Sequence, residues 1–445
     1  MFSKFEFRAF ISNIFKNATI TNVIIVGITT LIVSSLGFFK EIVVANTFGL
    51  SELLDTFYIA ILVPSFISGV FLGSFNSVFI PNYVSELKTG KSIGAFQSTS
   101  FLMTILVSLL FLIIAFLFTD VYLETFFKGH TQQYYDLIKV QFYYVAPCIL
   151  FWGFSSLING ILTIDNEFTF SSLNTVFTPI SIIFCLVFFK EQLGTIVLAF
   201  GTLVGSFLSF LFILTVAIKR NIIHLHKPDF KSVNIKILFK QLPAKLSSSL
   251  LSGINPLVDQ YFSAQLIIGS IAALNYGIKI PAFGISIIGA ALGNVLLPYF
   301  SKNAIDNRQE TFKKVTKILK YLIIVSSIVV VIGIFLSAPI ISILFERNAF
   351  TSSDTVIVSK IQQMYLLQIP SYVTGLVMVK FLTSINKNNF MVLASIINLL
   401  LNVVLNYMLI KSMGVYGLAL ATSLVSIINS IILYVYIIKL NKEYV

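Results

Sequence analysis

The stretch from Phe38 to Pro64 reads FFKEIVVANTFGLSELLDTFYIAILVP and joins two long apolar runs through a short polar segment. It places Lys40, Glu41 and Asp55 beside those runs, in a chain of 445 residues of which 57% are hydrophobic and 11% are charged. An ordinary soluble domain is about one quarter charged, and the mean hydropathy of this chain is +0.94. The sequence therefore predicts an all-α membrane protein that crosses the bilayer many times.

Apolar runs long enough to cross about 30 Å of hydrocarbon as helix recur along the chain. They predict twelve spans, at residues 18–39, 53–81, 97–118, 137–162, 168–189, 194–218, 241–264, 269–300, 321–338, 355–384, 389–410 and 414–438. If both termini lie on one side, that side carries most of the Lys and Arg outside the spans, so the positive-inside rule places both termini in the cytoplasm. The segment before the first span alternates basic and aromatic residues and is expected to lie at the membrane surface.

The two halves of the chain resemble each other. Both prolines of VPSFISGVFLGSFNSVFIP (63–81) match those of IPAFGISIIGAALGNVLLP (280–298), LGTIVLAFGT (193–202) matches MGVYGLALAT (413–422), and DNEF (165–168) falls near KNNF (387–390). Six spans per half give both halves the same orientation. We expect an N-terminal six-helix lobe at 1–218, a basic cytoplasmic linker at 219–240 and a C-terminal six-helix lobe at 241–445, arranged pseudo-symmetrically around a central cavity.

The predicted span 241–264 carries a polar stripe, in which every third or fourth residue is polar along one helical face. Its members are Gln241, Lys245, Ser248, Ser252, Asn255 and Asp259. Lipid does not accommodate such a stripe, and two prolines remove further backbone donors from the same helix. We expect the stripe to face a watery cavity, with hydrogen bonding to neighbouring helices as the alternative.

Two further polar features lie inside predicted spans. Asn398, Asn402 and Asn406 form a lesser stripe in the span 389–410, for which interhelical hydrogen bonds are the better interpretation. Lys279 lies inside the span 269–300, where a charge needs a partner or a watery face. It suits either an anionic ligand such as phosphate or an ion pair with Asp259.

Residues suited to catalysis or metal binding are scarce. His130, His224 and His226 lie in predicted loops. The motif GKS at 90–92 has Ser85 where a phosphate-binding loop requires glycine. We therefore expect a transporter and not an enzyme, with no catalytic residue, no metal and no cofactor.

The opening stretch and its continuation SVFIPNYVSEL contain a set of spaced positions that resembles a known family. These positions are Leu36-Gly37-Phe38, Lys40-Glu41, Ala45, Phe48-Gly49, Asp55-Thr56-Phe57, Pro64 and Phe79-Ile80-Pro81. They resemble the start of the lipid II flippase (MurJ/MviN) family, within the superfamily of multidrug, oligosaccharidyl-lipid and polysaccharide exporters. In the second half, AALNYGIKI with GAALGNVLLPYFSK resembles the stretch that carries the family's cavity arginine, and LFERNAFTSSD resembles the stretch before its tenth helix.

The resemblance implies a V-shaped bundle of two lobes with a cationic cavity between them. Such a protein turns an undecaprenyl-pyrophosphate-linked saccharide from the inner to the outer leaflet by alternating access, and the saccharide is lipid II or a repeat unit of a surface polysaccharide or O-antigen. With the polar stripe, it predicts substrate binding by Ser34, Lys40, Lys245, Asn255 and Lys279, and gating or ion coupling by Glu41, Asp55 and Asp259. Lys40 would bind the anionic head or form a gating pair with Asp55; alternatively, these charges only fix the turn between the first two spans.

Several positions depart from the family pattern. Ser34 and Lys40 stand where the family's first helix has arginines, Lys279 replaces another arginine, and Ser68, Gly69 and Gly73 replace charged residues of the second helix. Lysine keeps the charge of arginine but lacks the planar fork that grips a pyrophosphate. The family usually adds two helices for the lipid tail, so we expect a shorter, twelve-helix member.

The alternative function is an ion-coupled multidrug exporter of the same superfamily, which would want carboxylates in its cavity. The predicted interior is richer in lysine, which favours the flippase. The expected partners are a lipid-linked saccharide, membrane lipids and a coupling ion, Na⁺ or H⁺, with no nucleic acid. We expect a monomer in the bacterial cytoplasmic (inner) membrane.

Overall fold

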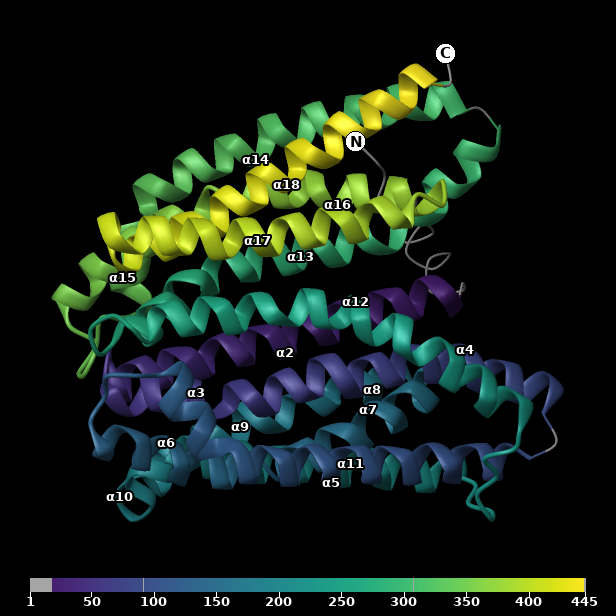
Figure 1. The fold of residues 1–445 in the computed structure, drawn as a ribbon, viewed down its shortest axis with the longest axis horizontal. Helices are drawn as coiled ribbons and strands as arrows, with labels where there is room; N and C mark the ends of the chain where they lie inside the picture. Colours follow the sequence, from purple (N-terminus) through teal and green to yellow (C-terminus); the bar gives the residue numbers. More distant parts are fainter. Residues whose placement is uncertain (1–17, 91, 307, 444–445) are drawn as a thin grey trace, which may run out of the picture. The chain divides into compact units, whose positions relative to one another are not determined.

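The computed structural model describes residues 18–90, 92–306 and 308–443, and their regular structure is helical apart from one isolated β-bridge between Arg347 and Phe350. The helices are labelled in Figure 1. Those of the first half are α2 (Ala18–Phe48), α3 (Glu52–Ile67), the π-helix η1 (Ser68–Leu72), α4 (Gly73–Thr89), α5 (Ile93–Phe126), α6 (Gln132–Val145), α7 (Cys148–Ile164), α8 (Phe168–Leu173), the 3₁₀ turn η2 (Asn174–Val176), α9 (Phe177–Phe188), α10 (Lys190–Leu193), the 3₁₀ turn η3 (Gly194–Ile196) and α11 (Val197–Lys219). Those of the second half are α12 (Val233–Ser263), α13 (Ser270–Asp306), α14 (Arg308–Phe345), α15 (Ser352–Leu366), α16 (Ile369–Ser384), α17 (Asn388–Met413) and α18 (Val415–Glu443).

The helices confirm the all-α, membrane-spanning fold. Each predicted span falls on one helix or on consecutive helical pieces, and eleven helical segments in the described ranges are long and apolar enough to cross a membrane. The remaining predicted span, 241–264, lies in α12, whose polar stripe makes it less apolar than the others. Several helices run past the predicted ends, as α2 does to Phe48, because polar residues continue a helix without a hydropathy signal. The predicted surface segment before the first span lies outside the described residues.

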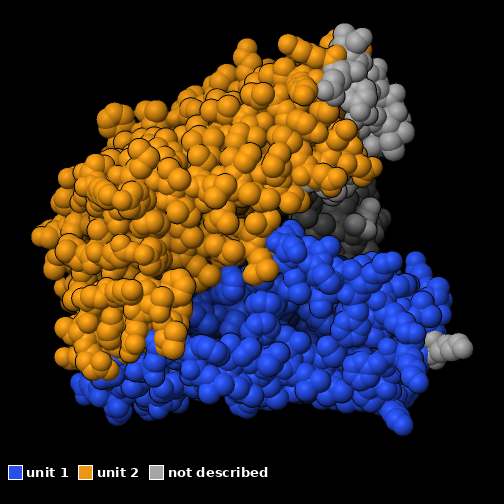
Figure 2. Space-filling view, in the orientation of Figure 1, with its two compact units in different colours: residues 1–43, 60–120, 136–249 blue, residues 44–59, 121–135, 250–445 orange. Residues whose placement is uncertain are grey.

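The chain divides into two compact units, which Figure 2 colours separately. Unit 1 comprises residues 1–43, 60–120 and 136–249, and unit 2 comprises 44–59, 121–135 and 250–445. Five helices each contribute residues to both units: α2, α3, α5, α6 (Gln132–Val145) and α12. The division into lobes at 1–218 and 241–445 is drawn on sequence similarity instead of compactness, and it stays a prediction.

Unit 1 is built around α4, α7 and α11. Phe79 and Tyr83 of α4 stack with ring centroids 5.4 Å apart, and they pack against Phe96 of α5 and Leu238 of α12 in one buried cluster. In a membrane such packing, and not the removal of apolar surface from water, stabilises helix contacts. The beginning of α12 is thereby fixed to α4 and α5.

The predicted linker follows α5 closely. Residues 220–232 are not helical, whereas α12 already begins at Val233. Backbone N–H groups of the linker donate to side chains of α5: His224 to Gln97 at 2.6 Å, His226 to Ser98 at 3.1 Å, and Asp229 to Thr99 at 2.9 Å. These bonds supply the partners that a non-helical backbone lacks.

Unit 2 contains α14, α16, α17 and α18, which lie side by side in Figure 1. Its largest described core gathers around Phe381 of α16, whose ring meets Phe300 and Phe312 edge-on at 5.7 and 5.0 Å. Leu433 and Ile437 of α18 complete this cluster. The beginning of α14 and the end of α18 therefore pack into one cluster around α16.

Backbone conformation repeats between the two halves, in agreement with the predicted duplication. Three pairs of residues have positive φ: Gly49 and Gly269, Asn166 and Asn386, and Gly194 and Gly414. The members of each pair are equally far apart in the sequence. The structural equivalent of Asn166 is thus Asn386, two positions before the asparagine that matching DNEF to KNNF suggests. Helix breaks at Pro147 and Pro370 also occur in corresponding spans.

We predict that Gly49→Ala destabilises the protein more than Gly194→Ala does. Both glycines have φ near +50°, where any Cβ costs roughly 1–2 kcal/mol. At Gly49 the added Cβ would lie 2.2 Å from the carbonyl oxygen of Ala349, whereas at Gly194 no atom lies within 4 Å. Thermal denaturation in detergent should therefore show an apparent Tm several degrees lower for Gly49→Ala than for the matched variant. Equal losses would mean that the contact with Ala349 relaxes at no cost.

Candidate functional site

The last turns of α2 carry the first predicted charges. Lys40 Nζ forms an ion pair with Glu41 Oε1 at 2.7 Å, and the two side chains are 21% and 6% exposed. Both residues belong to unit 1. A charge inside the hydrocarbon region is costly without a partner, and this ion pair gives each of the two side chains one. Ser34 lies half-buried on the same helix.

Asp55 in the first turn of α3 is buried, and its carboxylate caps another helix. Its two oxygens accept the backbone N–H groups of Gly269 at 2.6 Å and Ala272 at 2.7 Å, where α13 begins. Helix N-termini have unpaired N–H groups and a partial positive charge, so a carboxylate satisfies both. Asp55 therefore stabilises the start of α13 from a distant part of the sequence. Its predicted pairing with Lys40 stays a prediction, since the two residues belong to different units.

The end of α2 also binds the loop between α14 and α15. Asn348 Nδ2 donates to Asn46 Oδ1 at 2.9 Å, and the N–H of Ala349 donates to the carbonyl of Asn46 at 3.3 Å. Gly49 lies against the same loop. Sequence reasoning did not select these asparagines, although both lie within the two stretches that carry the family resemblance.

A carboxylate and several amides meet between α12 and α17. Asp259 Oδ1 accepts Asn402 Nδ2 at 3.1 Å and Asn406 Nδ2 at 2.8 Å, and Asn406 also donates to Asn402 Oδ1 at 3.2 Å. The prediction of interhelical hydrogen bonds for this asparagine stripe is confirmed for Asn402 and Asn406. Among the described residues, the buried Oδ1 atoms of Asn255, Asn398 and Asn406 have no hydrogen-bond donor. The faces of α12 and α17 thus hold oxygen atoms with free lone pairs near a carboxylate.

The polar stripe of α12 has two kinds of surroundings. At its first turns, Gln241 Oε1 accepts Asn82 Nδ2 at 2.9 Å, and the backbone carbonyl of Lys245 accepts Ser74 Oγ at 3.4 Å. In the middle, Ser248 and Ser252 are exposed. Gln241, Lys245 and Asp259 thus have hydrogen bonds to neighbouring helices, as the alternative interpretation expected, and the watery cavity stays a prediction. The side chain of Lys245 is half-buried.

The polar contacts of α4 with α12 include a buried carboxylate that sequence reasoning missed. Glu86 Oε2 accepts Asn234 Nδ2 at 2.6 Å, and Ser85 Oγ donates to Asn234 Oδ1 at 3.1 Å. Glu86 is 3% exposed. It belongs to the SVFIPNYVSEL continuation of the opening stretch, which is the sequence signal that pointed to it.

Two positions at which the chain departs from the family pattern lie beside irregular backbone, one near a proline and one at a π-helix. Lys279 is half-buried on α13, two residues before Pro281. Ser68 begins the π-helix η1, a form that recurs at functional sites. A Cβ added at Gly69 would meet no atom within 4 Å, so the neighbouring position opens onto free space.

Comparisons with known proteins place this geometry in a family. The family model described as lipid II flippase MurJ matches residues 44–443. The probable lipid II flippase MurJ of Buchnera aphidicola subsp. Schizaphis graminum is 31% identical over 427 residues, which cover 93% of this chain and 82% of the relative. The lipid II flippase MurJ of Thermosipho africanus is 29% identical over 408 residues, covering 91% and 83%.

Solved structures agree with this assignment. A lipid II flippase MurJ in an inward closed conformation has a TM-score of 0.80 at 29% identity, covering 93% of this chain and 87% of the solved one. An inward-facing multidrug transporter of the MATE family has a TM-score of 0.76 at 14% identity, covering 94% and 98%, and shows the shared fold alone. Since the family model spans most of the sequence, this chain belongs to the lipid II flippase MurJ family.

Proposed function

We propose that this protein is a flippase that moves lipid II, an undecaprenyl-pyrophosphate-linked saccharide, from the inner to the outer leaflet by alternating access. The observation that carries the proposal is the family match over residues 44–443, supported by the fold of a solved lipid II flippase. It acts as a transporter and catalyses no covalent step. The multidrug exporter remains the second candidate, because the fold is shared, but the half-buried Lys245 and Lys279 favour an anionic cargo over an organic cation.

The site of action that we propose is the bacterial cytoplasmic membrane, with both termini in the cytoplasm. The excess of Lys and Arg on one side of the predicted spans supports this orientation. We propose a monomer as the working unit.

Depletion of the protein should change the pool of lipid-linked saccharides. We predict that lipid II rises several-fold in depleted cells, since an unflipped precursor is not consumed, and that it returns to normal on complementation. Mass spectrometry of extracted lipids measures this. Accumulation of a different undecaprenyl-pyrophosphate saccharide would assign another cargo. An unchanged profile, in a strain shown to have no redundant flippase, would favour the drug exporter.

For the opening stretch we propose that Lys40 binds the pyrophosphate and Asp55 gates. Lys40 has an ammonium group near the end of a membrane helix. Asp55 binds the N-terminal end of α13, which would be released if the gate opens by a movement of this helix. Glu41 is the ion-pair partner of Lys40. Further contacts to the substrate head come from Ser34, Asn255, Lys245 and Lys279.

These roles predict that Lys40→Ala and Asp55→Asn act independently. Each of the two variants loses a charged hydrogen bond and should slow flipping about tenfold or more. Glu52→Gln, on the first turn of α3, is the control and should have little effect. In the double variant the two reductions should multiply, because Lys40 pairs with Glu41 and Asp55 binds α13. A double variant no worse than either single one would indicate a direct Lys40–Asp55 pair. Full transport by Lys40→Ala at normal protein levels would remove its proposed role.

We propose that the coupling ion binds at Asp259. A carboxylate beside amide oxygens with free lone pairs suits a hard cation, and the same carboxylate accepts a proton. Na⁺ and H⁺ are therefore both consistent with the chemistry of this cluster.

Gradients imposed on proteoliposomes should distinguish these ions. We predict that one gradient, of Na⁺ or of H⁺, accelerates flipping by the native protein and not by Asp259→Asn, which keeps the shape of the side chain but loses its charge. Asp120→Asn, at a carboxylate that is 66% exposed, serves as the control and should respond like the native protein. An Asp259→Asn variant with an undiminished response would rule out this site for coupling.

A further inference from the structure

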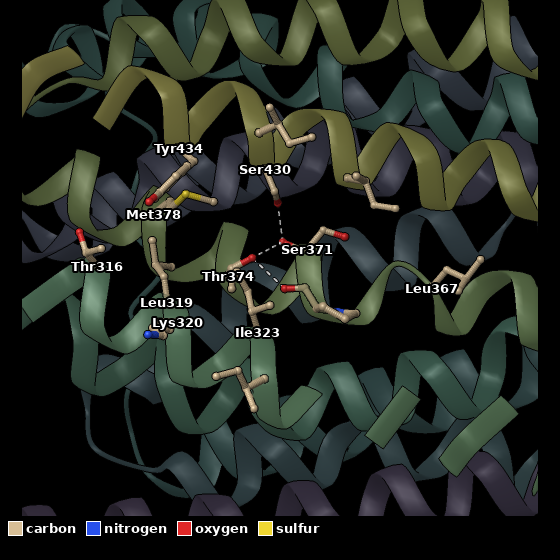
Figure 3. Close-up of a pocket in the computed structure, with 14 residues that line it drawn as sticks. Thr316, Leu319, Lys320, Ile323, Leu367, Ser371, Thr374, Met378, Ser430 and Tyr434 are labelled. Atoms are coloured by element: carbon tan, nitrogen blue, oxygen red, sulfur yellow. Dashed lines mark hydrogen bonds between the residues drawn. The ribbon is translucent and has the colours of Figure 1, made fainter. Parts of the chain in front are cut away.

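A cavity of about 690 Å³ lies within unit 2 among α14, α16 and α18. Ile323 of α14, Thr374 of α16 and Ile431 of α18 are among its walls, and each helix presents residues three or four positions apart (Figure 3). Ile323 and Ile431 are about half exposed, so the cavity opens at the surface. Its volume lies in the range of ligand pockets, roughly 300–1,000 Å³.

Three hydroxyl groups of the cavity wall already have hydrogen-bond partners. Thr374 Oγ1 donates to the carbonyl of Pro370 at 2.7 Å, Ser371 Oγ to that of Gln368 at 3.0 Å, and Ser430 Oγ to that of Ser371 at 2.5 Å. A polar ligand would therefore find few free donors along these walls, and the remaining lining is mainly aliphatic. The interior suits a hydrocarbon chain.

One end of the cavity is cationic. Lys320 lies there with Thr316 and Tyr434, whereas Leu367 lies at the opposite end (Figure 3). Lys317 is exposed on the same helix, three residues before Lys320. Lys439 is also exposed, on the part of α18 that shares the Phe381 cluster with the beginning of α14. An occupant with an apolar chain and an anionic head matches both ends.

We propose that this groove binds an acyl chain of an anionic glycerophospholipid, with Lys317 and Lys320 holding its phosphate. Basic residues beside a membrane helix attract anionic lipids at the cytoplasmic surface, and the predicted topology places the beginning of α14 on that side. The proposal is independent of the flippase assignment, because it concerns a lipid that stays bound to the surface of unit 2.

Fluorescence quenching tests the proposal on the full chain. Trp152 is the only tryptophan, so Trp152→Phe combined with Tyr434→Trp places a single reporter at the cationic end. We expect brominated phosphatidylglycerol to quench it at a mole fraction about fivefold or more below that of brominated phosphatidylcholine with the same chains. Lys317→Ala with Lys320→Ala should abolish this preference, whereas Lys190→Ala with Lys411→Ala, at exposed lysines elsewhere, should keep it. Equal quenching by the two lipids would overturn the proposal.

A second pair of variants tests the apolar part of the groove. Ile323→Phe should fill it and weaken the quenching by phosphatidylglycerol, whereas Ile328→Phe, 56% exposed on the same helix, should not. Equal behaviour of the two variants would show that bulk lipid causes the quenching. Displacement of the brominated lipid by undecaprenyl phosphate more readily than by unbrominated phosphatidylglycerol would assign the groove to a polyprenyl tail and overturn the proposal.

Discussion

The need to satisfy every polar group without water governs this structure. Inside hydrocarbon an unpaired backbone N–H or a lone carboxylate is costly, so spanning segments are helical and charges are paired. Asp55 meets this need for itself and for another helix, because its oxygens accept the N–H groups at the start of α13. Asp259 meets it through two asparagine amides, and Lys40 through Glu41. Asp55 and Asp259 thus tie together segments that are far apart in the sequence, whereas Glu41 pairs with its neighbour Lys40.

Duplication supplies the framework on which these contacts are placed. Equivalent turns in the two halves keep a left-handed residue, as Gly194 and Gly414 do, and equivalent spans are interrupted at Pro147 and Pro370. The polar contacts do not repeat in the same way. Asp55 has no carboxylate counterpart on α13, and the asparagines of α17 face a residue of α12. The repeated backbone therefore carries a different set of polar contacts in each half.

Hydropathy and spacing predicted much of this from the sequence. The spans followed from apolar runs, and the asparagine steps at 398, 402 and 406 predicted bonds to a neighbouring helix, which Asp259 provides for Asn402 and Asn406. The partner of Asp55 could not be predicted in this way, because backbone N–H groups occur at nearly every residue and carry no sequence signal. The bonds of the 220–232 segment to α5 could not be predicted from the sequence either, because their donors are main-chain N–H groups. Family resemblance and geometry are needed together to select the residues around which transport is proposed.

The π-helix η1 makes the duplicated halves unequal at one defined point. A π turn bonds each residue to the fifth one along, so the side chains that follow are rotated relative to an uninterrupted helix. The matching stretch of the second half lies inside the continuous helix α13. The two stretches are equally long between their matched prolines, so the difference lies in the winding of the helix and not in an inserted residue. The two halves therefore share a backbone plan while the side chains that follow η1 point in other directions than their counterparts on α13.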